Sequence, residues 1–173
     1  DRFMYPGRHA VQRADQPAFV MASSGEAVSY AELERRSNRL AHLLRAQAAR
    51  ALRRAGKYDE LEALLRDPDP RLRRAGLDGI IDVGLHGGIG NDPLKTEQYT
   101  PGITRAISAI LADTNEAWFV TDAALLAMYM APVEVIKENL PRILSFTKHP
   151  EWWLRASAFD ALLGLRRDTD PQT

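Results

Sequence analysis

The stretches LRRAGLDGI (residues 72–80) and LRASAFDAL (residues 154–162) carry leucine, arginine, a small residue and aspartate at the same places. A third stretch, VTDAALLAM (residues 120–128), follows the same order of large and small apolar residues less closely. The three begin 48 and 34 residues apart. Apolar residues at steps of three and four are typical of a helix with one buried face. The chain therefore contains a weak internal repeat whose recurring element is a helix.

Each of these stretches follows a cluster of turn-forming residues, at residues 67–70, 113–115 and 149–150, and another amphipathic segment precedes each cluster. This order predicts three helical hairpins, each with the repeated stretch as its second helix. Ala75, Ala123 and Ser157 occupy the same place in the three copies. Their small side chains predict close approach of neighbouring helices, with larger apolar residues filling the layer between hairpins.

The turn from Asp67 to Arg71, with its Asp-Pro-x-x-Arg order, and the Leu-Arg-x-Ala/Ser-x-x-Asp-x-Ile/Leu helix resemble HEAT and HEAT-like repeats. The resemblance covers residues 57–167, and the middle copy departs from it with Thr121 in place of arginine. It implies an α-solenoid whose stacked hairpins form a curved binding surface. We expect a mainly α fold, a short α-solenoid of HEAT-like hairpins over residues 47–173. Residues 84–93, rich in glycine, lack the order of a phosphate-binding loop, and we interpret them as an inserted turn between repeats.

The first part of the chain has a different pattern. Residues 17–21 and 27–29 predict two short strands joined by a turn at residues 23–26, which together form a hairpin. Ser29 and Glu32 have capping-box spacing, so a helix is expected to begin at Tyr30. Its apolar periodicity continues to Ala55, with Gly56 as the stop and a break near Gln47 as an alternative.

Residues 5–10, 15–18, 29–33 and 36–45 are similar to the beginning of acyl-CoA synthetases and related adenylate-forming ligases. The resemblance covers residues 3–46 and implies a structural lead-in, here residues 1–46, that precedes the catalytic apparatus of that family. The phosphate loop ending in Pro-Lys-Gly, the ribose-binding aspartate and the hinge domain with its lysine have no counterpart here. No catalytic residue is carried over. The junction near residue 47 is compatible with a natural fusion, an engineered chimera or an artefact of sequence assembly.

The amino-acid composition excludes several kinds of site and of protein. The absence of cysteine excludes thiol catalysis, disulfides and cysteine-ligated zinc. The longest apolar run, residues 123–133, is shorter than the roughly 20 residues of a membrane span. We expect a soluble, cytoplasmic protein without a membrane partner. Because the chain begins at Asp1 rather than Met, we interpret it as a processed or excerpted piece.

Charge is distributed unevenly along a chain whose net charge is zero. Residues 35–74 contain 12 basic and 5 acidic side chains, which gives this segment a net charge of +7. Such a segment could meet nucleic acid or an acidic protein. The alternative is a solvated, arginine-rich helix face that balances the acidic C-terminal half.

The candidate interface residues are two aromatic side chains and four arginines at the repeat helices: Trp152, Trp153, Arg71, Arg73, Arg74 and Arg155. Trp118 and the Trp152–Trp153 pair begin repeat helices, where an aromatic ring either packs over the hairpin end or anchors a partner. The four histidines are far apart and form no metal-binding pair. We predict no catalytic residue, cofactor or metal.

These observations favour a non-catalytic scaffold that binds a protein or peptide. Two alternatives remain open. The chain could be an inactive N-terminal fragment of an ATP-dependent adenylate-forming ligase, or a HEAT-like nucleic-acid-binding protein of the DNA glycosylase type, with Asp160 as an acidic residue. Salt-dependent DNA binding would distinguish the last of these. The oligomeric state is left undecided.

Overall fold

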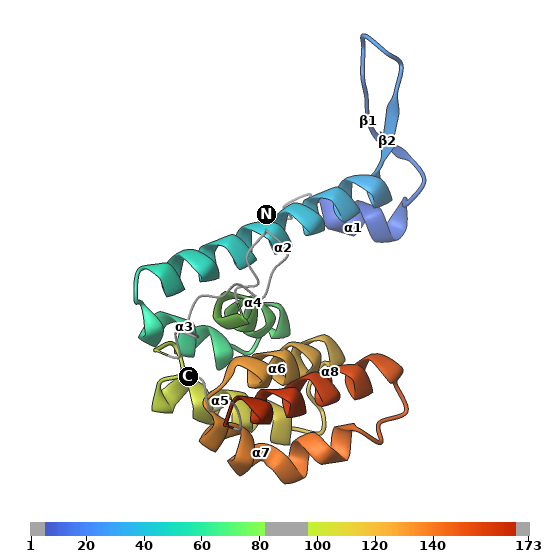
Figure 1. Cartoon of the computed structure of the whole chain (residues 1–173). Coiled ribbons are helices and arrows are strands. Elements are labelled where there is room, and N and C mark those ends of the chain that lie inside the picture. Colours follow the sequence, from blue (N-terminus) through green and yellow to red (C-terminus); the bar gives the residue numbers. More distant parts are fainter. Residues whose placement is uncertain (1–5, 82–96, 169–173) are drawn as a thin grey trace. The chain divides into compact units, whose positions relative to one another are not determined.

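The protein is mainly α-helical, as predicted, in a computed structural model that describes residues 6–81 and 97–168 (Figure 1). The chain divides into two compact units, residues 1–44 and 45–173. Helix α2, Tyr30–Arg54, contributes its first half to the first unit and its second half to the other. The inserted turn predicted at residues 84–93 lies outside the described residues.

The first unit contains α1 (Pro6–Gln12) and the antiparallel strands β1 (Pro17–Val20) and β2 (Ala27–Ser29). The hairpin is therefore confirmed, with Phe19 opposite Val28 and an irregularity in register between Pro17 and Phe19. Gly25 at the turn has a φ of 71°, which glycine adopts without steric cost. Helix α1 was not predicted, because its seven residues are too few to show a helical period.

Helix α2 begins at Tyr30 as predicted, is unbroken at Gln47 and ends at Arg54, one residue before the predicted end at Ala55. The Ser29 hydroxyl accepts a hydrogen bond from the amide of Glu32, at 3.3 Å. The carboxylate of Glu32 pairs with Arg35 and Arg36. The hydrogen bond from Arg36 holds the pKa of Glu32 below its usual value. At the other end, Gly56 has a φ of 67° and closes a Schellman motif.

The second unit stacks three helical hairpins into a short solenoid in two layers. The first helices of the hairpins are α3 (Tyr58–Leu65), α5 (Pro101–Ala112) and α7 (Val133–Phe146). The second helices are α4 (Pro70–Ile81), α6 (Trp118–Met130) and α8 (Trp152–Leu163), followed by a 3₁₀ turn, η1 (Gly164–Asp168). Helix α6 lies between α4 and α8, and α5 packs against both α3 and α7 (Figure 1).

Burial follows the repeat that the sequence predicts. Ala75, Ala123 and Ser157 are all buried, as close approach of neighbouring second helices requires. Two of the turn clusters are built as Asx turns: Asp67 accepts from the amide of Asp69, and Asp113 from that of Asn115. The large residues of the core come from all three hairpins, and those that are completely buried include Leu61, Leu77, Ile80, Ile103, Ile107, Leu125, Met128 and Ile143.

The last turns of α2 pack against α4 at the first end of the solenoid. Gly79 of α4 meets Ala49, which is fully buried, and the Arg53 guanidinium donates to the carbonyl of Ile80 at 3.3 Å. A Cβ at position 79 would lie 2.9 Å from the backbone of Ala49. Glycine is therefore required here by the close approach of two helices.

We expect Gly79→Ala to destabilise the protein by about 1–3 kcal/mol, as overpacking typically does. A loss of stability would be informative, because replacing glycine by alanine in a helix interior otherwise stabilises the helix by about 1 kcal/mol. Urea denaturation followed by circular dichroism measures the difference. A stabilised variant would contradict the contact between α2 and α4.

None of the helices within residues 6–81 and 97–168 combines the length and the apolar character needed to cross a membrane.

Candidate functional site

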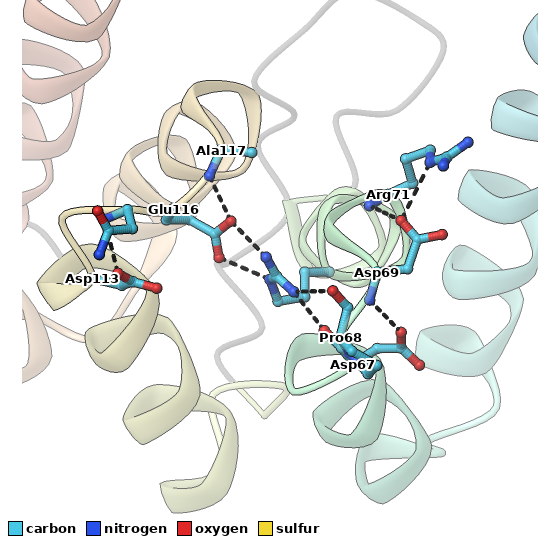
Figure 2. A network of polar contacts seen from close by, with 9 residues as sticks. Asp67, Pro68, Asp69, Arg71, Asp113, Glu116 and Ala117 are labelled. Carbon is cyan, nitrogen blue, oxygen red and sulfur yellow. Dashed lines mark hydrogen bonds and ion pairs between the residues drawn. The ribbon is translucent and has the colours of Figure 1, made fainter.

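Arg73 is the centre of a polar network that joins the first two hairpins (Figure 2). Its Nη1 donates to the carbonyls of Asp67 and Pro68, at 2.6 and 3.0 Å. Its Nε and Nη2 donate to the two carboxylate oxygens of Glu116, at 2.8 and 2.7 Å. The guanidinium thus closes its own hairpin turn and also binds the turn of the next hairpin.

Glu116 is almost completely buried, with 3% of its side chain exposed, against 19% for Arg73. One of its oxygens also accepts from the amide of Ala117, at 2.7 Å, at the N-terminus of α6. The hydrogen bond to Glu116 raises the pKa of Arg73 above its usual value. The role of the pair is to hold two turns together.

Arg155 repeats half of this arrangement in the third hairpin. Its Nη1 donates to the carbonyls of His149 and Pro150, at 2.8 and 2.7 Å. These acceptors lie six and five residues before Arg155, the same separations as those of Arg73 from Asp67 and Pro68. The middle hairpin has Thr121 at this place. The arginine of the repeat therefore has a structural contact that the sequence analysis did not anticipate.

Arg74 lies one residue further along α4 and points to the next second helix. Its Nε donates to Asp78 at 2.8 Å, and its Nη1 donates to the carbonyl of Phe119 at 2.7 Å and lies 3.8 Å from Asp122. Asp122 in turn accepts from the hydroxyl of Ser157, at 2.6 Å. Polar contacts therefore run from α4 through α6 to α8. Arg74 and Asp122 occupy the same place in the first and second copies of the repeat, and Ser157 lies one place further on in the third copy.

Arg71 is the one exposed member of the four candidate arginines. It pairs with Asp69 at 3.3 Å (Figure 2). Asp69 also accepts from the amide of Arg71, and this backbone hydrogen bond is the main cause that lowers the pKa of the Asp69 carboxyl. Asp69 thus stays charged at the start of α4, where a carboxylate is favoured.

Four aromatic rings form a continuous series across α6 and α8, which we call the aromatic row: Phe119, Trp118, Trp153 and Trp152. Successive ring centroids are 5.9 Å apart, and all three pairs meet edge to face. Trp118 is 58% exposed and Trp152 65% exposed, whereas Trp153 is half-buried between them. The Trp153 Nε1 has no hydrogen-bond partner among the described residues.

The structure therefore separates the predicted candidates into two groups. Trp152 and Trp153 lie together in the aromatic row, with Trp118 as a neighbour that is not among the six candidate residues. Arg73, Arg74 and Arg155 are engaged by carboxylates and carbonyls of the solenoid itself. The repeat alignment could have pointed to Trp118, because it occupies the same place in the second copy as Trp152 in the third.

Two depressions lie along the edge formed by the hairpin turns. The larger, of about 570 Å³, is lined by Arg73, Arg105, Asp113 and Glu116 among others. The smaller, of about 270 Å³, includes Trp118, Arg142 and His149. Arg142 is itself bound to the carbonyls of Leu111 and Ala112 at the end of α5. Within the described parts of the chain, no three acidic or histidine side chains are grouped as metal ligands.

Comparisons of the chain with protein-family models, with curated proteins and with solved structures find no match.

Proposed function

We propose that the protein is a non-catalytic helical-repeat scaffold that binds a protein or peptide through the aromatic row. The observation that carries this proposal is the exposure of Trp118 and Trp152 on two adjacent second helices, with Trp153 joining them. Tryptophan is enriched among the residues that dominate binding energy at protein interfaces. Two large exposed rings held in fixed geometry offer apolar area with little loss of side-chain entropy on binding.

The polar residues of the solenoid support a binding role over a catalytic one. Glu116 accepts hydrogen bonds from Arg73. Asp122 forms an ion pair with Arg74 and accepts a hydrogen bond from Ser157. A general acid or base needs a group that is available to a substrate and held within hydrogen-bond reach of it. These groups instead join one hairpin to the next, which is what the resemblance to HEAT-like repeats leads us to expect of a scaffold.

A protein or peptide is a better match to this surface than a nucleic acid. Nucleic-acid binding without sequence readout combines aromatic rings with lysine or arginine side chains that contact phosphates. Of the candidate arginines on α4 and α8, Arg73, Arg74 and Arg155 already donate to backbone carbonyls of the solenoid. A phosphate backbone would therefore have to compete with these contacts for three of the four candidate arginines.

Selection from a displayed library of linear peptides on the intact chain tests this proposal. We expect micromolar ligands whose affinity falls about 30-fold in Trp118→Ala, which corresponds to the roughly 2 kcal/mol of an interface hot spot. Phe19→Ala is the matched control, since Phe19 is an exposed aromatic residue of the first unit, and it should leave the affinity within about twofold. Circular dichroism establishes that both variants are folded. Ligands that bind Trp118→Ala and Trp152→Ala as tightly as the parent chain would refute the proposal.

A second candidate function is favoured by the first unit. Large apolar side chains are exposed on its hairpin, at Phe19, Val20 and Met21, and on α2, at Leu40, Leu43 and Leu44. Apolar surface of this extent is typical of a contact face. It supports the alternative that residues 1–46 are a piece of a larger adenylate-forming domain, with these side chains placed to pack against the rest of that domain.

A further inference from the structure

The middle hairpin has threonine where the other two hairpins have the arginine that closes the turn. Thr121 is the fourth residue of α6, as Arg73 is of α4 and Arg155 of α8. The turns before α6 and α8 also have the same length, five residues each, at 113–117 and 147–151. The turn before α6 therefore has the same frame as the turn before α8, without a guanidinium bound to it.

The carbonyls that an arginine at position 121 would bind are those of Asn115 and Glu116, six and five residues before it. Their counterparts in the third hairpin, the carbonyls of His149 and Pro150, both accept from Arg155. In the parts of the chain that the structure describes, the carbonyls of Asn115 and Glu116 accept no hydrogen bond. Two acceptors in the arrangement that binds a guanidinium elsewhere in the solenoid thus remain free for a donor from another molecule.

The smaller of the two depressions, of about 270 Å³, lies at this turn. Its lining includes Thr121, Asp113 and Glu116, and also Trp118, which belongs to the aromatic row as well. Pockets for drug-sized ligands measure about 300–1,000 Å³, so this cavity suits a single side chain. A partner that covers the aromatic row is therefore placed to insert one side chain beside Thr121.

The charges around the cavity favour a cation. Asp113 forms no ion pair within the described residues, and one of its carboxylate oxygens accepts from the amide of Asn115. Arg142 also lines the cavity, but its Nε and Nη2 donate to the carbonyls at the end of α5, and its Cζ lies 5.2 Å from the ring centroid of Phe146. The Nδ1 of His149 accepts from a backbone amide of its own turn. The charge that remains without a partner is the carboxylate of Asp113.

We propose that the partner of the aromatic row inserts an arginine side chain into this cavity. Its guanidinium donates to the carbonyls of Asn115 and Glu116, Asp113 supplies the counter-charge, and the exposed ring of Trp118 adds a cation–π contact. A guanidinium is favoured over an ammonium, because its planar fork of donors matches two neighbouring acceptors. The inference rests on the proposed function and adds the chemistry of the partner, which is an arginine close to an apolar residue.

Titration of the intact chain with N-acetyl-arginine N-methylamide, followed by two-dimensional amide NMR, tests the cavity by itself. We expect saturable shifts at residues 113–121 with a Kd of about 1–10 mM, since a single side chain supplies little binding energy. The citrulline analogue has the same shape without the charge and should bind about 10-fold more weakly, because hydrogen bonds from a charged donor are stronger. Absence of shifts, or equal binding of the two probes, would overturn the proposal.

Two substitutions locate the binding. Asp113→Asn keeps an acceptor for the turn and removes the charge, so it should weaken the arginine probe about fivefold, as loss of an exposed ion pair does. Thr121→Arg supplies the guanidinium from within the chain, so it should abolish binding of the probe and raise the Tm by about 2–4 °C. Ser37→Arg adds the same charge at an exposed position of α2 and should do neither. A folded Thr121→Arg chain that still binds the probe would contradict the site, and Asp113→Asn decides the matter where Thr121→Arg does not fold.

The peptides selected on the parent chain separate this inference from the proposed function. They should contain an arginine whose replacement by citrulline lowers affinity about 10-fold, since the charged hydrogen bonds are lost. Peptides that depend on Trp152, which borders the aromatic row and not the cavity, but tolerate citrulline would overturn the arginine site and leave the proposed function standing. Peptides that are indifferent to Trp118→Ala and Trp152→Ala would refute the proposed function, even where the arginine probe still shifts residues 113–121.

Discussion

Leu125→Ala is expected to lower the free energy of unfolding by about 3–4 kcal/mol, the cost typical of a fully buried leucine in a core that relaxes little. Leu125 lies on α6, the helix with a second helix on either side of it, and none of its surface is exposed. Removal of its side chain therefore leaves a cavity between hairpins. Urea denaturation followed by circular dichroism measures the change.

Phe159→Ala is the matched control for Leu125→Ala, since both residues occupy the same place in the repeat. Because Phe159 is exposed on the outer face of α8, its removal should cost less than about 1 kcal/mol under the same conditions, although a larger side chain is lost. Equal costs at the two positions would mean that the outer face of α8 is covered within a single chain. That result would contradict the exposure of Phe159.

Glu116→Ala is the second substitution with a large expected effect, about 3 kcal/mol of destabilisation. The carboxylate accepts two hydrogen bonds from Arg73 and one from the amide of Ala117. Its loss leaves a partly buried guanidinium without its counter-charge, which is the costly way to break an ion pair. Chemical denaturation reports the change, and Glu116→Gln should lie between the parent and the alanine variant because it keeps a hydrogen-bond acceptor.

Glu60→Ala provides the comparison with an ion pair that is exposed to solvent. Glu60 lies 3.6 Å from Lys57, and both side chains are at least half exposed. Pairs of this kind contribute between about 0 and 1 kcal/mol. A loss below about 0.5 kcal/mol at Glu60, beside a large loss at Glu116, would show that burial gives the Arg73 network its strength. Similar losses at both positions would contradict that assignment.

The solenoid itself is predictable because its determinants are local or periodic. Turn residues such as Asp67 and Asp113 bond to amides two residues away, and Gly56 ends α2 by its own conformation. The small residues at positions 75, 123 and 157 recur in register with larger neighbours, so comparison of the chain with itself locates the hairpins.

The partners of the polar side chains are not predictable in the same way. Glu116 meets Arg73 across 43 residues, and no spacing rule connects them. Arginines that look like an exposed basic surface in the sequence are engaged by carbonyls once the turns close, as Arg155 shows. The exposure of Phe159 likewise depends on whether another helix follows α8 in space, which the repeat pattern alone does not say.

The division of the chain illustrates a further limit of local patterns. The sequence resemblance changes near residue 47, within a helix that continues to Arg54. The boundary between the two compact units lies between residues 44 and 45. Ala46 and Ala49 are buried, so the residues that follow the boundary pack with the solenoid. The assignment of residues 1–46 to an adenylate-forming ancestry remains a prediction that rests on sequence resemblance.

The clamp that Arg73 and Arg155 place on their own turns has a consequence for cooperativity. Bonds that span five or six residues close each hairpin from within, so a hairpin carries part of its stability alone, and the rest comes from coupling to its neighbours. Among the described residues, the first hairpin is coupled to α2 and to the second hairpin, the second hairpin to the first and the third, and the third hairpin to the second alone. In such a linear array the end unit opens at the lowest free energy. Among the described hairpins, local opening should therefore begin at α7 and α8.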